Sequence, residues 1–161
     1  MGSNFEDCLG RTQLHRLLDQ IDPSDLEEDW ILRECIESRS DEGFDVQDVL
    51  GRTPLHIACQ KGWVHGVSSM LQHGADSSVS TIYGSLTLHY AAAQGSHHIY
   101  QLLSMNRDNV DFEARDCAEK TPFQYAELWG YEDIARLPVF ASSLLGGTQK
   151  YDIDRYIRSR G

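Results

Sequence analysis

Residues 51–62 read GRTPLHIACQKG, and residues 84–95 read GSLTLHYAAAQG. The two stretches match at five positions with a constant offset of 33 residues. These pairs are Gly51/Gly84, Leu55/Leu88, His56/His89, Ala58/Ala91 and Gly62/Gly95. Self-similarity at a fixed period of roughly 20–50 residues is typical of repeat architectures, in which short units stack side by side. The sequence therefore predicts a repeat protein.

Two weaker copies flank this pair. Residues 121–130 read TPFQYAELWG and follow at an offset of 35 residues, and residues 10–15 read GRTQLH, 41 residues before their counterpart. With these motifs the chain resembles the ankyrin-repeat family over roughly residues 7–137. The resemblance implies that each repeat forms a turn, an inner helix, an outer helix and a loop, stacked into a short curved solenoid.

The predicted fold class is all-α: an ankyrin-repeat solenoid of about four repeats with short β-turn or hairpin tips. Two central repeats are regular, and the two terminal ones are atypical caps, because one of their faces meets water. The expected organisation is one repeat domain over residues 1–141 and a C-terminal tail over 142–161. Within the domain we expect repeats near 7–47, 48–80, 81–115 and 116–141, and an acidic helical insertion around 24–40.

Local signals fit this frame. Thr53 can cap a helix that Pro54 begins, and Gly62 and Gly95 can end inner helices in the left-handed conformation. Apolar residues at helical spacing predict the buried sides of two outer helices: Val67, Met70, Leu71, Ile99, Leu102 and Leu103. In the insertion, a capping box at Ser24 and Glu27 predicts a helix to about Ser38. Its expected buried side consists of Leu26, Trp30, Ile31 and Cys35.

The charge is strongly asymmetric. The 161 residues carry a formal charge of -11, and residues 1–50, with 14 acids and 4 bases, account for -10 of it. Without a cationic surplus, direct binding to nucleic acid or to an anionic membrane is disfavoured. The four cysteines are far apart in sequence, which favours reduced thiols in an intracellular protein, cytoplasmic or nuclear. We expect a monomer.

Catalytic and metal chemistry have little support in the sequence. His15, His56 and His89 occupy the histidine position of the motif, and the resemblance implies that they bond to neighbouring backbone. A zinc site at His65, His97 and His98 lacks a placed cysteine or carboxylate to complete it. No nucleophile motif or phosphate-binding loop is present. We therefore expect no enzyme activity, no metal and no cofactor.

Protein binding is the predicted function. In this family the turn tips and the exposed side of the inner helices form a concave face that holds protein partners. The resemblance places on that face Leu9, Val49, Leu50, Arg52, Lys61, Ile82, Tyr83, Gln94, Lys120, Leu128 and Trp129. Large apolar side chains are unusual on tips that meet only water, which points to a partner. The alternative left open is that some of them tuck into the stack of turns or under the tail, above all Trp129.

An acidic assembly chaperone or inhibitor is the alternative function. Its N-terminal third would shield a basic client protein, through a cluster formed by Asp19, Asp22, Asp25, Glu27, Glu28 and Asp29. Association of this kind is fast and weakens with salt. An acidic N-terminal cap that only keeps the protein soluble, without binding a client, would have the same sequence features.

Overall fold

The computed structural model describes residues 8–20, 22, 26–37, 44–106 and 111–135, with only the backbone described for residues 26–29 and 32. The predicted tail over 142–161, the capping residue Ser24, and Asp25 lie outside the described residues. Within these limits every regular element is an α-helix, so the predicted all-α class is confirmed.

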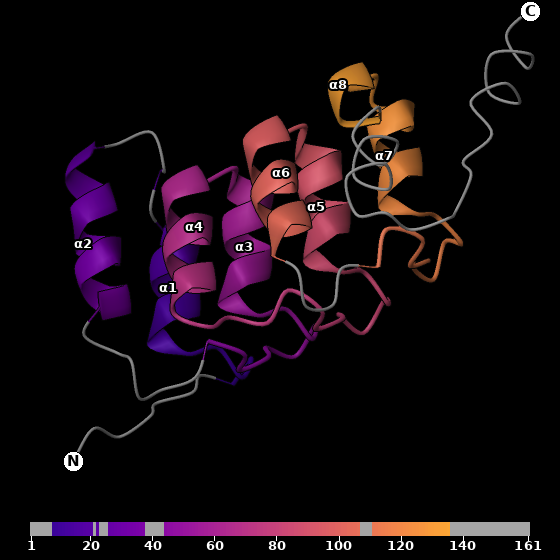
Figure 1. Ribbon diagram of the computed structural model, residues 1–161. Coiled ribbons are helices and arrows are strands. Elements are labelled where there is room, and N and C mark those ends of the chain that lie inside the picture. The colour runs from indigo at the N-terminus through magenta and orange to yellow at the C-terminus, as the bar shows by residue number, and fades with distance from the viewer. Residues whose placement is uncertain (1–7, 21, 23–25, 38–43, 107–110, 136–161) are drawn as a thin grey trace, which may run out of the picture.

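The helices form two layers (Figure 1). The inner layer consists of α1 (Gln13–Gln20), α3 (Pro54–Lys61), α5 (Thr87–Gln94) and α7 (Pro122–Leu128). The outer layer consists of α2 (Leu26–Glu37), α4 (Val64–Gln72), α6 (His97–Met105) and α8 (Glu132–Ala135). Each helix packs against the next one of its own layer and against its partner in the other layer. The predicted stack of helix pairs is therefore the observed fold.

Local sequence explains where the inner helices begin and end. Thr53 precedes α3 with extended backbone, and its backbone N–H and hydroxyl both lie against the His56 ring, while Pro54 fills the first helical position. Gly62 ends the helix with a left-handed φ of 73°, and its N–H reaches back to the last turn of α3. Gly95 ends α5 in the same way, as predicted.

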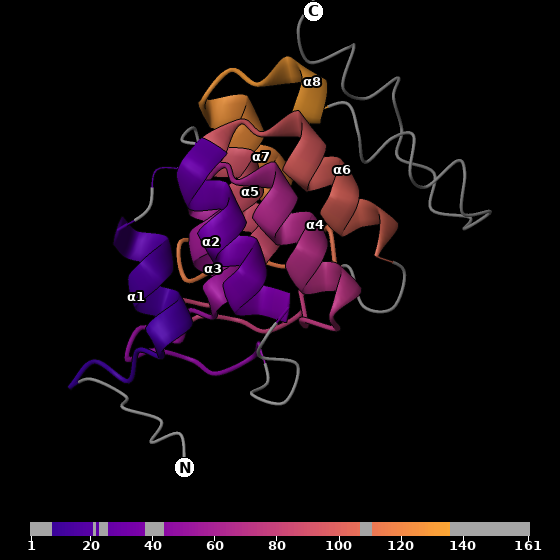
Figure 2. The ribbon, with the colours of Figure 1, turned by 90° about the vertical axis from the view of Figure 1, so that its left-hand side faces the viewer.

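Helix α2 corrects one expectation. It packs on α4 as α4 packs on α6, so it takes the place of an outer helix at the end of the stack (Figure 2). Trp30 and Ile31, which were predicted to be buried, are 61 % and 43 % exposed, whereas Ile36 is fully buried. Among the described residues α2 meets one outer-layer helix, α4, so the side of the helix that carries Ile36 is covered while Trp30 and Ile31 stay exposed.

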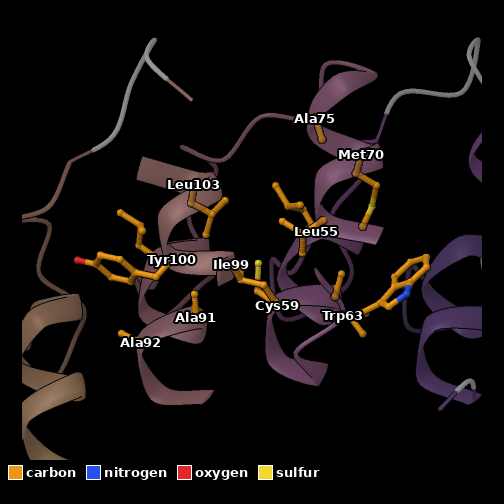
Figure 3. Close-up of a cluster of buried hydrophobic side chains, with 14 of the residues drawn as sticks. Leu55, Cys59, Trp63, Met70, Ala75, Ala91, Ala92, Ile99, Tyr100 and Leu103 are labelled. Atoms are coloured by element: carbon orange, nitrogen blue, oxygen red, sulfur yellow. The ribbon is translucent and has the colours of Figure 1, made fainter. Parts of the chain in front are cut away.

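The core lies between the two layers and is continuous along the described stack (Figure 3). Leu55 and Ala58 from α3 meet the outer-helix residues Val67 and Met70, and all four are fully buried. The outer-helix stripes at Val67, Met70, Ile99 and Leu103 are thus confirmed, while Leu71 and Leu102 are partly buried. Burial of this apolar surface is the main stabilising term for such a stack.

Trp63 lies flat against the start of α4, and a glycine makes this possible. A Cβ atom added to Gly66 would lie 1.6 Å from a ring carbon of Trp63, and Trp63 is only 3 % exposed. No side chain other than hydrogen fits between the helix and the indole ring.

We expect Gly66→Ala to destabilise the protein by about 1–3 kcal/mol because the methyl group overpacks the indole site. Elsewhere in a helix the same change stabilises by up to about 1 kcal/mol. In a Trp63→Leu background the clash is relieved, so Gly66→Ala should become neutral or stabilising. Urea unfolding of the four proteins measures the coupling; a stabilising Gly66→Ala with Trp63 present would contradict this packing.

Candidate functional site

In the turns before α3, α5 and α7 a buried side chain accepts hydrogen bonds from backbone N–H groups of its own turn. In the second repeat the Asp48 carboxylate accepts hydrogen bonds from the backbone N–H groups of Leu50 (2.9 Å) and Arg52 (2.8 Å), and it forms an ion pair of 2.8 Å with the Arg52 guanidinium. Burial opposes the charged form, but these bonds to Arg52 and Leu50 prevail and hold the pKa of Asp48 below its usual range. We call this set of bonds to a buried aspartate the aspartate brace. In the turn that it holds, the side chains of Val49 and Leu50 are exposed.

The fourth repeat uses the same brace. Asp116 accepts from the backbone of Ala118 and Lys120 and from the Tyr125 hydroxyl at 2.6 Å, and the bond to Asp116 raises the pKa of Tyr125 to about 12. Glu119 stands where the other repeats have glycine and takes a left-handed φ of 57°. In the third repeat Thr81 replaces the aspartate, and its hydroxyl accepts from the Ser85 N–H at 3.2 Å.

Consecutive turns are joined by backbone hydrogen bonds. The Val49 N–H donates to Leu9 (2.9 Å), the Ile82 N–H to Leu50 (3.0 Å), and the Cys117 N–H to Tyr83 (2.8 Å). Gly51 makes the approach possible, since a Cβ atom there would lie 2.8 Å from the backbone nitrogen of Ile82. The turns therefore form one continuous edge along the stack.

Five of the predicted binding residues lie together on this edge. We call Leu9, Val49, Leu50, Ile82 and Tyr83 the tip row. Their exposed fractions run from 36 % for Leu50 to 62 % for Ile82. The alternative was that some of these side chains are buried in the stack of turns. In the described part of the chain all five are exposed. The structure thus shows a row of exposed apolar side chains on a hydrogen-bonded support.

Leu128 and Trp129 lie elsewhere. They are 65 % and 62 % exposed, but they stand at the C-terminal end of α7, in the positions that Gln60 and Lys61 occupy on α3. A helix of seven residues is about 10 Å long, so these two side chains are separated from the turn of their own repeat by the length of α7. The predicted site therefore divides into the tip row and a second apolar spot at the far end of the inner layer.

The predicted polar residues also serve the fold. Arg52 holds Asp48, and the Lys61 ammonium donates to the backbone oxygen of Asp19 at 2.7 Å. The Gln94 side chain lies over Gly62, where a Cβ atom would come within 3.6 Å of it. Lys120 is half-buried, and its backbone exchanges two hydrogen bonds with Asp116. These residues therefore help to hold the turns and the inner helices in place.

The acidic patch can be located only in part. Asp19 is exposed and its carboxylate lies 3.0 Å from the Arg11 guanidinium, and Asp22 is exposed as well. Asp25 lies outside the described residues. Glu27, Glu28 and Asp29 are on α2, but their side chains are outside the description. Of the predicted cluster the described residues therefore place the side chains of Asp19 and Asp22 alone, and the cluster stays a prediction.

Two of the three motif histidines, His15 and His89, connect neighbouring repeats, as the resemblance implied. Nδ1 of His15 accepts from the Thr12 N–H, so Nε2 carries the hydrogen and donates to the Arg52 carbonyl of the next repeat at 3.0 Å. His89 repeats the arrangement with Leu86 and with the carbonyls of Ala114 and Lys120. Burial lowers the pKa of both imidazoles, although the carbonyl bonds oppose it.

His56 is the most deeply buried of the three. Its Nδ1 accepts from the Thr53 N–H, and its ring meets the Tyr90 ring edge-on at 5.4 Å between centroids. Nε2 reaches no partner in hydrogen-bond geometry within the described part of the chain, although the nearby Ser85 backbone favours the protonated form. Burial dominates and lowers the pKa of His56 to about 4.

Neither a metal-binding cluster nor a membrane-spanning helix is present among the described residues. No group of three or more His, Cys, Asp and Glu side chains there could hold a metal ion, and no helix there is both long and apolar enough to cross a membrane. The four cysteines are free thiols, and burial raises the pKa of Cys59 far above its usual value.

Sequence reasoning missed two features. One is the exposure of apolar side chains on the outer layer and its ends: Trp30, Ile31, Met105 and Tyr131. No local signal distinguishes them from buried residues. The other is the aspartate brace, which did have a signal, because Asp48/Arg52 and Asp116/Lys120 stand at the same spacing in two repeats.

Comparisons with known proteins agree with this architecture. Residues 27–116 match the family model described as ankyrin repeats in three copies. A putative ankyrin repeat protein of Rickettsia bellii is 31 % identical over 93 residues, covering 56 % of this chain and 50 % of that protein. NF-kappa-B inhibitor alpha of Gallus gallus is 39 % identical over 70 residues, covering 44 % of this chain and 20 % of that protein.

A third relative is neurogenic locus notch homolog protein 1 of Xenopus tropicalis, which is 33 % identical over 75 residues, covering 47 % of this chain and 3 % of that protein. The chain thus spans half or less of the length of these relatives.

The buried histidines predict acid sensitivity. The unfolded chain protonates His56 below about pH 6.5, whereas the folded protein resists protonation until about pH 4. Stability contributed by neutral His56 is therefore complete above about pH 6.5 and is lost as the pH falls to about 4, by at most about 3 kcal/mol. Because the pKa values of His15 and His89 are also lowered in the folded protein, their contributions to stability fall with pH as well.

His56→Gln should flatten this dependence, measured as the free energy of unfolding in urea at several pH values in that window. Glutamine suits the position because Gln124 fills it in the fourth repeat, where its side-chain oxygen accepts from the Thr121 N–H at 3.0 Å. The pKa values of Asp48 and Asp116 are held below their usual range, so the stability they contribute is lost only at the acid end of the window, and it is lost equally in both proteins. An unchanged slope in His56→Gln would rule out His56 as its source.

Proposed function

The chain belongs to the ankyrin-repeat family, a family of protein–protein interaction modules, and from this premise we propose that it is a non-enzymatic adaptor or regulator that binds a protein partner through its tip row. The tip row itself carries the proposal. Five large apolar side chains stand on turns, where a monomer in water gains nothing from exposing them.

The support beneath the row favours tight binding. Backbone hydrogen bonds join successive turns, and Asp48 and Asp116 brace two of them from below. A partner therefore meets side chains on a backbone that is already ordered, and less conformational entropy is lost on association. Tyr83 adds an aromatic ring of the kind that dominates interface energies.

The relatives support a regulatory role. NF-kappa-B inhibitor alpha is by its name an inhibitor of another protein, and it is similar to this chain over 70 residues. His15 and Asp48 form hydrogen bonds within the fold itself. The exposed apolar tip row is therefore the surface that we assign to recognition of a partner.

The alternative, an acidic chaperone or inhibitor for a basic client, keeps one supporting observation. Among the described residues twelve Asp and Glu are exposed, but only two Lys and Arg, namely Arg33 and Arg115. This surplus is spread along the stack, and seven of the twelve acids follow residue 50. A basic client would therefore not need to be confined to the N-terminal third.

Removal of the apolar tips of the third repeat should weaken partner binding. We expect Ile82→Ser/Tyr83→Ser to weaken capture of partners from the native source by at least about tenfold, since two large apolar anchors are truncated. The matched control is Trp30→Ser/Met105→Ser, which removes two side chains of similar exposure, 61 % and 64 %, from the outer layer. Quantitative mass spectrometry of the captured proteins provides the comparison.

Thermal unfolding of both variants confirms that they are folded. If the tip variant retains every partner at wild-type levels, the tip row is not the binding surface. If partners are kept by both variants but lost as salt is raised to about 500 mM, the acidic alternative is favoured instead.

A further inference from the structure

The C-terminal end of the inner layer carries an uncovered apolar surface. Helices α7 and α8 are the last pair of the described stack (Figure 1). Every residue from Glu127 to Asp133 is exposed. Three of these residues have large apolar side chains, with exposed fractions of 65 % for Leu128, 62 % for Trp129 and 37 % for Tyr131. We call these three residues the end patch.

The earlier repeats show what this surface lacks. Gly62, Gly95 and Gly130 stand at the ends of successive inner helices. A Cβ atom added to Gly62 would lie 3.6 Å from the Gln94 side chain, and one added to Gly95 would lie 2.4 Å from the Tyr131 ring. In the described part of the chain, a Cβ atom added to Gly130 would meet nothing within 4 Å. The first two helix ends are thus covered by the repeat that follows, and the end patch has no such cover among the described residues.

The charge around the end patch is negative. Residues 121–135 contain no Lys or Arg but three exposed acids: Glu127, Glu132 and Asp133. The bases that precede α7, Arg115 and Lys120, lie at the other end of this helix, which is about 10 Å long. Lys61 stands at the same end of the inner layer, but on α3, two helices away. The backbone carbonyls at the end of α7 add further partial negative charge. A complementary cover therefore carries both apolar side chains and cations.

One segment of the chain itself has this composition. Residues 136–161, which lie outside the described residues, contain five Lys and Arg and two Asp, a net charge of +3. Arg136 directly follows α8, and residues 137–149 contain no charged residue. The other four bases fall within residues 150–160, together with Tyr151, Ile153, Tyr156 and Ile157. From Ala135 to Lys150 the chain can span up to about 50 Å, several times the length of α7, so the segment can reach the end patch.

We infer that residues 150–160 cover the end patch, with their apolar side chains against Leu128 and Trp129 and their arginines near the surrounding acids. The contact goes beyond the proposed function, which concerns the tip row, and it removes Leu128 and Trp129 from the surface that meets a partner. The connection favours this segment over a separate protein, because a tethered segment acts at an effective concentration in the millimolar range. A second copy would bring its own acids against those of the first.

The accessibility of Trp129 tests the inference in the full chain. The chain has three tryptophans, and Trp63 is only 3 % exposed, so in a Trp30→Phe background Trp129 accounts for the fluorescence that acrylamide can reach. The quenching constant should rise at least about twofold with Tyr156→Ser/Ile157→Ser, since the uncovered form becomes populated. The matched control Leu144→Ser/Leu145→Ser removes two apolar side chains before this segment and should leave the constant unchanged. The unquenched signal of Trp63 shows that each variant is folded.

A charge exchange tests the polar half of the contact. Arg155→Glu/Arg158→Glu should also expose Trp129, because glutamates then face Glu127 and Asp133. Adding Glu127→Lys/Asp133→Lys to that variant should restore the protection. Adding Glu119→Lys, which changes an exposed acid on the fourth turn, should not restore it.

Three results would overturn the inference. The first is a quenching constant that neither pair of changes within residues 150–160 alters. The second is exposure of Trp129 by Leu144→Ser/Leu145→Ser to the same extent, which would assign the cover to the preceding segment. The third is protection that disappears on dilution from about 100 to 1 μM, because a contact within one chain does not depend on protein concentration.

Discussion

The close packing of each inner helix on the next is the constraint on which the rest of the structure depends. Ala58, Ala91 and Ala126 stand at the same position in α3, α5 and α7, and all three are fully buried. With a methyl group at this position, no larger side chain holds the helices apart. Because a repeat contacts only its neighbours, the resulting step is copied along the stack, and the turns and their apolar tips inherit it.

Much of the polar chemistry in this chain serves that packing. A buried polar group is costly unless it is hydrogen-bonded. His15 and His89 meet this requirement by reaching a carbonyl of the next repeat, and Asp48 and Asp116 by closing a turn. These histidines and aspartates therefore serve the fold.

The central repeats could be predicted almost completely because their signals are local. A capping threonine with proline, a terminal glycine and apolar stripes at helical spacing are each read within a few residues, as α3 to α6 show. The orientation of α2 could not be read this way. Trp30 and Ile31 lie on a helix with apolar residues on more than one side, and the packing of α2 on α4 decides which side is covered.

The sequence by itself determined the repeat, the helix boundaries and the apolar identity of the tips, because these depend on spacing and capping over short distances. Only the tertiary structure decided that five tips form one edge while Leu128 and Trp129 stand a helix length away. It also decided which charges remain exposed. Among the described residues after position 50, the sequence has eight acids and four bases, but seven acids and one base are exposed, because Arg52, Lys61 and Lys120 are half-buried.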